Sequence, residues 1–203
     1  EMSGNLMTVE QIMTEIEKER VFFEQSGGGV TFSGGEPLLH PEFLIQLLDE
    51  CGRQGIHRVV DTAGLVNTDI LLEVAKRTDL FLFDLKMMES GLHRQWTGVP
   101  NGKILENLRI LAESGASINI RIPLIGGVND DEENITETAR FIASLQGKKI
   151  AVNLLPYHKI AMTKYQKLGM GEEFVSLEEP TQGRQQEAMD ILREHGIEVN
   201  IGG

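Results

Sequence analysis

The feature that most constrains the fold of this sequence is a regular alternation of short apolar runs with segments of helical periodicity. Between the runs, apolar residues recur every three or four positions, a spacing that places them on one helix face. Strands that alternate with helices in this way predict βα units and a parallel sheet. The predicted strands are residues 29–33, 58–62, 80–86, 117–123, 150–156 and 197–201, and the predicted buried helix faces are Leu44, Leu47, Leu48 and Cys51, then Ile104, Leu108 and Leu111, then Ile135, Ala139 and Ile142.

A helix is predicted ahead of the first strand. Thr8 and Gln11 have the spacing of a capping box, and apolar residues at Val9, Ile12 and Ile16 follow with helical periodicity. A parallel α/β protein that opens on a helix has the appearance of a chain that lacks its first strand. We therefore expect an N-terminally truncated domain.

Composition and charge narrow the class of protein. The 203 residues are 40% hydrophobic and 25% charged, which is typical of a globular protein, and we expect residues 1–203 to form a single domain. A formal net charge of -12 argues against a nucleic-acid partner. No apolar run is long enough to cross a bilayer and no signal peptide is recognisable, so we expect a cytoplasmic protein with no membrane partner.

The turn after the first predicted strand has the composition of a ligand-binding turn. It reads Ser33, Gly34, Gly35, Glu36 and Pro37. Two adjacent glycines allow positive φ angles and a close approach of the backbone to a ligand, and Glu36 places a carboxylate where it could face an ammonium group. The alternative is an ordinary strand-to-helix turn with a solvated glutamate.

Polar residues also lie at the carboxyl ends of the next four predicted strands. In parallel α/β folds the carboxyl ends of the strands meet on one face, where ligands bind. Two carboxylates at that face suit a hard cation, although a helix cap or a salt bridge would explain each acid equally well. The residues concerned are Asp61, Asp84, Lys86, Arg121 and His158.

These motifs, taken in order, resemble those of the radical S-adenosylmethionine (SAM) enzymes that activate glycyl radical enzymes, the activases of pyruvate formate-lyase in particular. The resemblance runs from about Met7 to the C-terminus and includes a weaker match at residues 164–169. It implies a partial parallel (β/α)6 TIM-like barrel that lacks its first strand in this chain. The matching segments are residues 27–37, 61–64, 84–86, 97–99, 121–125 and 154–158.

The resemblance also implies the residues of a cofactor site. Gly34, Gly35 and Glu36 would hold the amino group of S-adenosylmethionine, and the other contacts to its carboxylate, ribose and adenine would come from Ser33, Lys86, Arg121 and His158. A monovalent cation beside the cofactor would be bound by Asp61, Thr62, Leu82 and Asp84, with Asp61 serving both the cation and the cofactor site. For His158 the alternative is a surface histidine, and for Lys86 it is a salt bridge with Asp84.

One departure from the family is decisive for the chemistry. The family binds a [4Fe–4S] cluster on three cysteines of a CxxxCxxC loop, and this sequence contains only Cys51. Because Cys51 lies on a predicted apolar helix face, we expect a buried, inert thiol. We expect the cluster loop upstream in the full-length protein, and we expect this chain alone to be inactive.

The activity implied is reductive cleavage of S-adenosylmethionine to a 5′-deoxyadenosyl radical that abstracts hydrogen from a glycine of the partner. The partner would be pyruvate formate-lyase or a relative, with flavodoxin or ferredoxin as electron donor. Two alternatives stay open: a cluster-free S-adenosylmethionine-binding module or pseudo-enzyme, and a phosphate-binding barrel that uses Gly126-Gly127 or Gly202-Gly203. The acidic residues 130–133 argue against phosphate.

Overall fold

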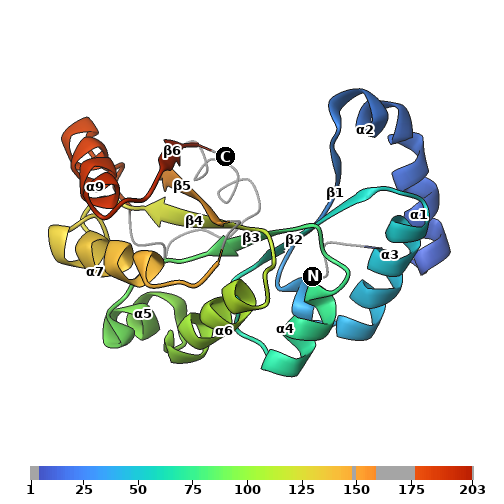
Figure 1. Cartoon of the computed structure of the whole chain (residues 1–203), viewed down its shortest axis with the longest axis horizontal. Coiled ribbons are helices and arrows are strands. Elements are labelled where there is room, and N and C mark those ends of the chain that lie inside the picture. Colours follow the sequence, from blue (N-terminus) through green and yellow to red (C-terminus); the bar gives the residue numbers. More distant parts are fainter. Residues whose placement is uncertain (1–4, 148–149, 159–176, 203) are drawn as a thin grey trace.

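The computed structural model describes residues 5–147, 150–158 and 177–202. Its elements alternate as the sequence predicts (Figure 1). They are α1 (Val9–Lys18), α2 (Arg20–Ser26), β1 (Gly29–Phe32), the short 3₁₀ helix η1 (Pro37–Leu39), α3 (Pro41–Arg53), β2 (His57–Thr62), α4 (Thr68–Ala75), β3 (Leu80–Asp84), α5 (Ser90–Thr97), α6 (Gly102–Glu113), β4 (Ile118–Leu124), α7 (Glu132–Ala143), β5 (Ile150–Pro156), α9 (Gln182–Glu194) and β6 (Val199–Ile201).

The six strands form one parallel sheet in the order β1-β2-β3-β4-β5-β6. Each strand pairs with its neighbour in sequence, as expected of successive right-handed βα units. The sheet is open, because β1 and β6 stand at its two edges and do not pair with each other. This confirms the predicted α/β fold of a partial barrel.

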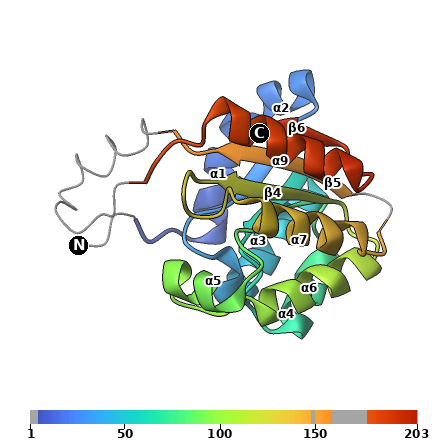
Figure 2. The same cartoon turned by 90° about the vertical axis from the view of Figure 1, so that its left-hand side faces the viewer.

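Helices cover the outer face of the curved sheet, from α1 and α3 beside β1 to α9 beside β6 (Figure 1). Figure 2 shows α7 and α9 side by side along β5 and β6, with α4 and α6 together below the sheet. Burial therefore alternates along a strand: Ile118, Ile120 and Ile122 of β4 are buried under helices, while Asn119 and Arg121 face the inner side and are half-buried. The functional candidates lie on this inner side and at the carboxyl ends.

All the predicted helix faces are buried, which confirms them as core. Cys51 is fully buried in a small cluster in which α1 packs on α3, and its Sγ lies 3.7 Å from Sδ of Met13. Burial raises the pKa of the Cys51 thiol to about 11. The prediction that Cys51 behaves as a small hydrophobic residue is confirmed.

The predicted start of α1 is also confirmed. Thr8 accepts a hydrogen bond from the backbone of Gln11, and the Gln11 side chain accepts one from the backbone of Thr8, which completes the capping box. Strand ends differ by one or two residues from the predictions: β3 ends at Asp84, and β6 begins at Val199 because Ile197 still belongs to the turn after α9. Residues 164–169 lie outside the described residues.

None of the helices in the described ranges has the length and apolar character needed to span a membrane.

Candidate functional site

The turn after β1 has the backbone conformation that its two glycines allow. Gly34 has φ 94° and Gly35 has φ 57°, both in the region that favours glycine. A Cβ added at either residue would meet no protein atom within 4 Å. The space beside this turn is therefore open to a ligand, which could approach the backbone closely.

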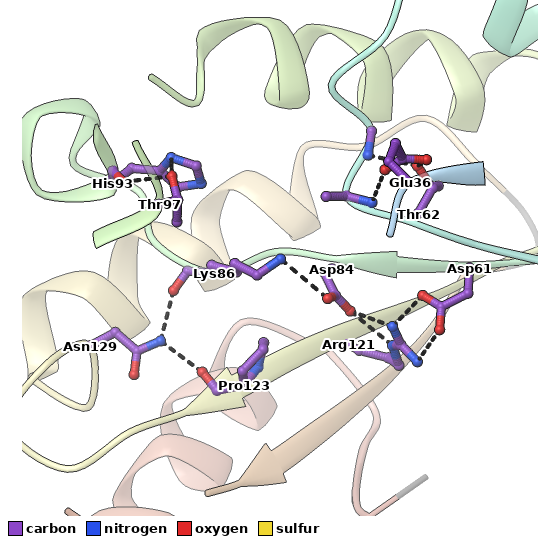
Figure 3. Close-up of polar contacts among 12 residues, drawn as sticks. Glu36, Asp61, Thr62, Asp84, Lys86, His93, Thr97, Arg121, Pro123 and Asn129 are labelled. Carbon is purple, nitrogen blue, oxygen red and sulfur yellow. Dashed lines mark hydrogen bonds and ion pairs between the residues drawn. The ribbon is translucent and has the colours of Figure 1, made fainter. Parts of the chain in front are cut away.

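The Glu36 carboxylate is held rigidly at the end of this turn. Its Oε1 accepts hydrogen bonds from Leu38 N at 3.2 Å and from the Thr62 hydroxyl at 2.8 Å, and its Oε2 accepts one from Ala63 N at 2.9 Å (Figure 3). A carboxylate has about four acceptor sites. Three protein donors leave one site for a donor on a ligand, which fits the predicted contact with an ammonium group.

Asp61, Asp84 and Arg121 form an ion triad on the inner face of the sheet (Figure 3). The Arg121 guanidinium donates from Nη1 to Asp61 Oδ2 at 3.1 Å and from Nε to Asp84 Oδ1 at 2.9 Å. The register places Asp84 directly opposite Arg121 on β4, and Asp61 opposite Leu82 on β3. Three strands therefore contribute to the triad, whose side chains are only 19% to 23% exposed.

The electrostatics of the triad keep the guanidinium charged. Burial by itself would lower the pKa of Arg121, because it disfavours the charged form. The attraction and hydrogen bonds of Asp84 and Asp61 have the larger combined effect and raise the pKa of Arg121 above its ordinary value. The two carboxylates predicted to bind a cation thus have Arg121 as their counter-charge in the described structure. Thr62, predicted in the same site, donates its hydroxyl hydrogen to Glu36. Cation binding by these residues remains a prediction.

Lys86 follows β3 and reaches back towards the triad. Its Nζ lies 3.2 Å from Asp84 Oδ2, so the salt bridge considered as an alternative is present. The side chain is 36% exposed, which leaves its other donors available to a ligand. The salt bridge and a role in ligand binding are therefore compatible.

Buried asparagines, which the sequence analysis missed, fix the loops that carry these residues. Asn129 donates to the carbonyl oxygens of Lys86 and Pro123, both at 2.7 Å, and its own Oδ1 accepts from Ile125 N at 2.8 Å. Asn107 fixes the loop after β2 in a similar way, because its amide donates to Gly64 O and Val66 O. The available signal was an asparagine among apolar neighbours, as between Ile104 and Leu108.

Asparagines also hold the segment after Lys86. Asn101 donates to the carbonyl oxygens of Met87 and Met88, and Asn134 Oδ1 accepts from Met88 N. Because Asn101 and Asn129 are each at most 3% exposed, these bonds are shielded from water. The polar groups at the carboxyl ends of β2 and β3 are therefore pre-positioned by asparagines from later parts of the chain.

The structure does not bring two of the predicted residues into this cluster. Ser33 is exposed, and it lies beside a cavity formed by α1, β1 and α3. His158 follows β5 with a side chain 68% exposed, and its Nδ1 lies 3.9 Å from Glu179 Oε1. Their predicted contacts with a cofactor remain predictions.

The resemblance implies two groups, S-adenosylmethionine and an iron–sulfur cluster, and the residues of this chain fit only the first. The open glycine turn, the Glu36 carboxylate with a free acceptor site, and the Lys86 ammonium fit the amino acid part of S-adenosylmethionine. The residues of this chain do not fit an iron–sulfur cluster, because Cys51 is its single cysteine and is fully buried. Within the described residues, no group of three or more His, Cys, Asp or Glu side chains is placed to hold a metal ion.

Known proteins that are similar to this chain indicate its family. Residues 2–139 match the radical SAM superfamily. The trans-4-hydroxy-L-proline dehydratase activating enzyme of Clostridioides difficile is 42% identical over 205 residues, covering 100% of this chain and 68% of that protein. The choline trimethylamine-lyase activating enzyme of Oleidesulfovibrio alaskensis is 39% identical, covering 82% of this chain and 54% of that protein. The chain thus spans about half to two thirds of the length of these relatives.

A solved structure shows the same fold at high identity. A domain of pyruvate-formate lyase-activating enzyme from Bacteroides vulgatus superposes with a TM-score of 0.75 at 46% identity, covering 87% of this chain and 99% of that domain. The fold, the ordered motifs and the relatives lead to one conclusion. The chain belongs to the radical SAM superfamily and, within it, to the activating enzymes of glycyl radical enzymes.

Proposed function

We propose that the protein of which this chain forms part activates a glycyl radical enzyme, and that this chain supplies the S-adenosylmethionine site. The observation that carries the proposal is the carboxyl-end cluster: an open glycine turn, a rigid Glu36 with one free acceptor site, and Lys86 on an asparagine-clamped loop. A zwitterionic amino acid needs an acceptor for its ammonium and a donor for its carboxylate. Glu36 and Lys86 have those complementary charges.

The residues of this chain are proposed to bind and orient S-adenosylmethionine. Gly34, Gly35 and Glu36 hold the amino group, and the remaining contacts come from Lys86, Arg121, Ser33 and His158. Asp61, Thr62, Leu82 and Asp84 provide a site for a monovalent cation. Bound S-adenosylmethionine supplies the hydrogen-abstracting chemistry of the family, so no general base or nucleophile is required of the chain.

The iron–sulfur cluster is proposed to be bound by cysteines outside these 203 residues, because Cys51 does not fit that role. The partner is proposed to be pyruvate formate-lyase or another glycyl radical enzyme, and flavodoxin or ferredoxin the electron donor. The relatives act, by their names, on different partners: a hydroxyproline dehydratase in one case and a choline trimethylamine-lyase in another. Partner choice therefore has to depend on surfaces that vary within the family.

A second candidate function is a cluster-free S-adenosylmethionine-binding module. The observation that favours it is the absence of a cluster ligand from the sequence in hand. Both candidates require the same cofactor site, so S-adenosylmethionine binding alone does not separate them.

The deciding experiment measures iron and acid-labile sulfide in the full-length protein purified without oxygen. About four irons per chain are expected for one cluster, and more for additional ferredoxin-type clusters. The reduced protein is then mixed with S-adenosylmethionine and a candidate glycyl radical enzyme, and the glycyl radical is recorded by electron paramagnetic resonance. Iron-free protein that cannot be reconstituted would leave the binding module as the function.

A further inference from the structure

A groove of about 340 Å³ lies between α5 and α7, in the outer layer of helices (Figure 1). None of its lining residues belongs to the candidate cofactor site. Its apolar side chains are those of Met87, Met88, Leu92 and Val128, and every charged side chain that lines it is acidic. The groove is therefore a separate surface that combines apolar walls with negative charge.

The apolar part of the groove runs from the core to the surface. Met87 is 4% exposed, Met88 and Val128 are half-buried, and Leu92 is 43% exposed. Trp96 lies one turn after Leu92 on α5, hence on the same helix face, and is 38% exposed. Tryptophan and methionine are enriched at protein interfaces, and methionine adapts its shape to a bound partner. This surface therefore suits the apolar side chains of another protein.

The two sides of the groove are tied together by Asn134 in the first turn of α7. Its Oδ1 accepts a hydrogen bond from Met88 N at 2.9 Å, and its Nδ2 donates to Asn129 O at 2.9 Å. The segment after β3 is thus fixed to the start of α7. A preformed groove loses little conformational entropy when it binds a partner.

Two of the acids in the groove cap the helices beside it. Glu89 accepts hydrogen bonds from the backbone N–H groups of Leu92 and Gly91, which hold the pKa of its carboxyl below the ordinary value. Asp131 accepts one from Asn134 N at 2.9 Å. These contacts fix both carboxylates in place.

The other two acids project from α7 and are available to a partner. Glu133 and Glu137 are one helical turn apart, so they lie on the same face. Glu137 forms an exposed ion pair with Arg140, of a kind that contributes little stability and exchanges readily. The Glu133 side chain has no ion pair or hydrogen bond with any residue that the structure describes.

Charge selects the class of occupant. A second copy of this chain also has a formal net charge of -12, and an anionic membrane or nucleic acid is likewise negative, so each would be repelled. A segment with lysine or arginine would be attracted. Glu133 and Glu137 on α7, like Leu92 and Trp96 on α5, repeat after one helical turn, which is the spacing that a bound amphipathic helix presents.

We propose that the groove between α5 and α7 binds a basic amphipathic helix of a partner protein. Lysine or arginine side chains of that helix pair with Glu133 and Glu137, and its apolar side chains contact Met88 and Leu92. Binding there does not require S-adenosylmethionine, because the groove and the cofactor site share no residue.

The test uses the full-length protein labelled with ¹³C at the methionine methyl groups. The probe is a capped peptide of about 14 residues, roughly four helical turns, with leucine on one face and lysine on the other. It is expected to move the Met87 and Met88 resonances and to leave that of Met13, which is 6% exposed in the cluster between α1 and α3, unchanged. Unmoved Met87 and Met88 resonances would overturn the proposal.

Two controls test the choice of occupant. A peptide with the same leucines and glutamate in place of lysine is expected not to bind, and equal binding of the two peptides would overturn the selection by charge. Without peptide, the Met88 resonance is expected to be independent of protein concentration. A resonance that moves with protein concentration alone would assign the groove to a second copy of the chain and overturn the proposal.

Variants locate the contact. Glu133→Gln is expected to raise the Kd of the lysine peptide about twofold to fivefold, the effect of one exposed ion pair, and Leu92→Ser about fivefold through lost apolar contact. Glu42→Gln is the matched control, because Glu42 lies in the first turn of α3 as Glu133 does in that of α7. An equal rise in Glu42→Gln would show unspecific attraction to an acidic protein and overturn the proposal.

Discussion

Asp84 and Arg121 are register partners on neighbouring strands, and the guanidinium donates two hydrogen bonds to a single oxygen of the carboxylate, from Nε at 2.9 Å and from Nη2 at 2.6 Å. The same guanidinium also donates to the carboxylate of Asp61. With Lys86, which forms a salt bridge with Asp84, the guanidinium offsets the charges of the two acids at the place where the sequence predicts a monovalent cation.

Replacement of this guanidinium should reveal the affinity of the two acids for a cation. Arg121→Gln is expected to lower the free energy of unfolding by about 2 kcal/mol, because half-buried Asp61 loses its guanidinium partner and Asp84 keeps only Lys86. The loss should be smaller in potassium chloride than in tetramethylammonium chloride at equal ionic strength, if Asp61 and Asp84 bind a small cation. Urea denaturation in the two salts measures both effects.

A matched control exists at the other end of the same strands. Arg58 on β2 pairs with Asp79 with an Nε to Oδ2 distance of 2.9 Å and is similarly shielded, at 21% exposed. Arg58→Gln should also lower stability, but it should show no preference for potassium and no change in S-adenosylmethionine affinity. An identical salt response in both variants would contradict the cation site.

The Glu36 carboxylate should dominate the binding of the cofactor amino group. In Glu36→Gln the side-chain amide can accept at one atom only, and the charge that faces the ammonium is lost. We expect the Kd of S-adenosylmethionine, measured by isothermal titration calorimetry, to rise about tenfold to a hundredfold. Glu42→Gln on the exposed first turn of α3 is the control, and an equal change there would argue against a specific contact.

Asn129 should matter for Lys86 although it does not contact a ligand itself. Asn129→Asp keeps the oxygen that accepts from Ile125 N. It replaces the amide that donates to Lys86 O with a carboxylate oxygen, and the two oxygens repel each other. The expected result is a loss of about 2 kcal/mol of stability and weaker S-adenosylmethionine binding. Asn67→Asp is the matched control, because Asn67 only accepts a bond at the start of α4. Unchanged cofactor affinity in folded Asn129→Asp would remove its positioning role.

Cys51 should impose a dependence of stability on alkaline pH. Burial raises the pKa of its thiol from 9.0 to about 11, so the folded state favours the protonated form. The resulting stability is fully present below the pKa of the unfolded thiol and is lost as the pH rises through the folded value. The difference in unfolding free energy between wild type and Cys51→Ala should therefore fall by about 2 to 3 kcal/mol from pH 9 to 11. A constant difference would show that the thiol is solvated.

The open edge at β1 should make the 203-residue chain self-associate. Unpaired strand edges and exposed apolar side chains favour association. The edge strand β1 is preceded by α2, in which Val21 and Phe22 are 59% and 63% exposed. Small-angle scattering should show a mass that rises with concentration, and Thr31→Lys on β1 should reduce the rise. A monodisperse monomer at all concentrations would refute this.

The sequence by itself determined the type and order of the elements. The apolar runs and helix faces are local patterns, and all the predicted faces, such as Leu44 with Cys51, are buried as expected. It also placed Asp61, Asp84 and Arg121 on one side of the molecule, since the ends of parallel strands share a face. The glycine turn was likewise predictable, because positive φ angles at Gly34 and Gly35 depend on residue type.

Only the tertiary structure decided which of these groups interact. Strand register, which depends on packing across the whole sheet, put Arg121 opposite Asp84 and made it the counter-charge of two acids. The asparagine bonds join residues far apart in sequence, such as Asn129 and Lys86, and no local pattern encodes such a pair. The burial of His93 on α5, whose Nδ1 lies 2.7 Å from Val99 O, likewise depends on how α5 packs against the loop that follows it, because hydrogen-bond partners are fixed by three-dimensional distance rather than by sequence spacing.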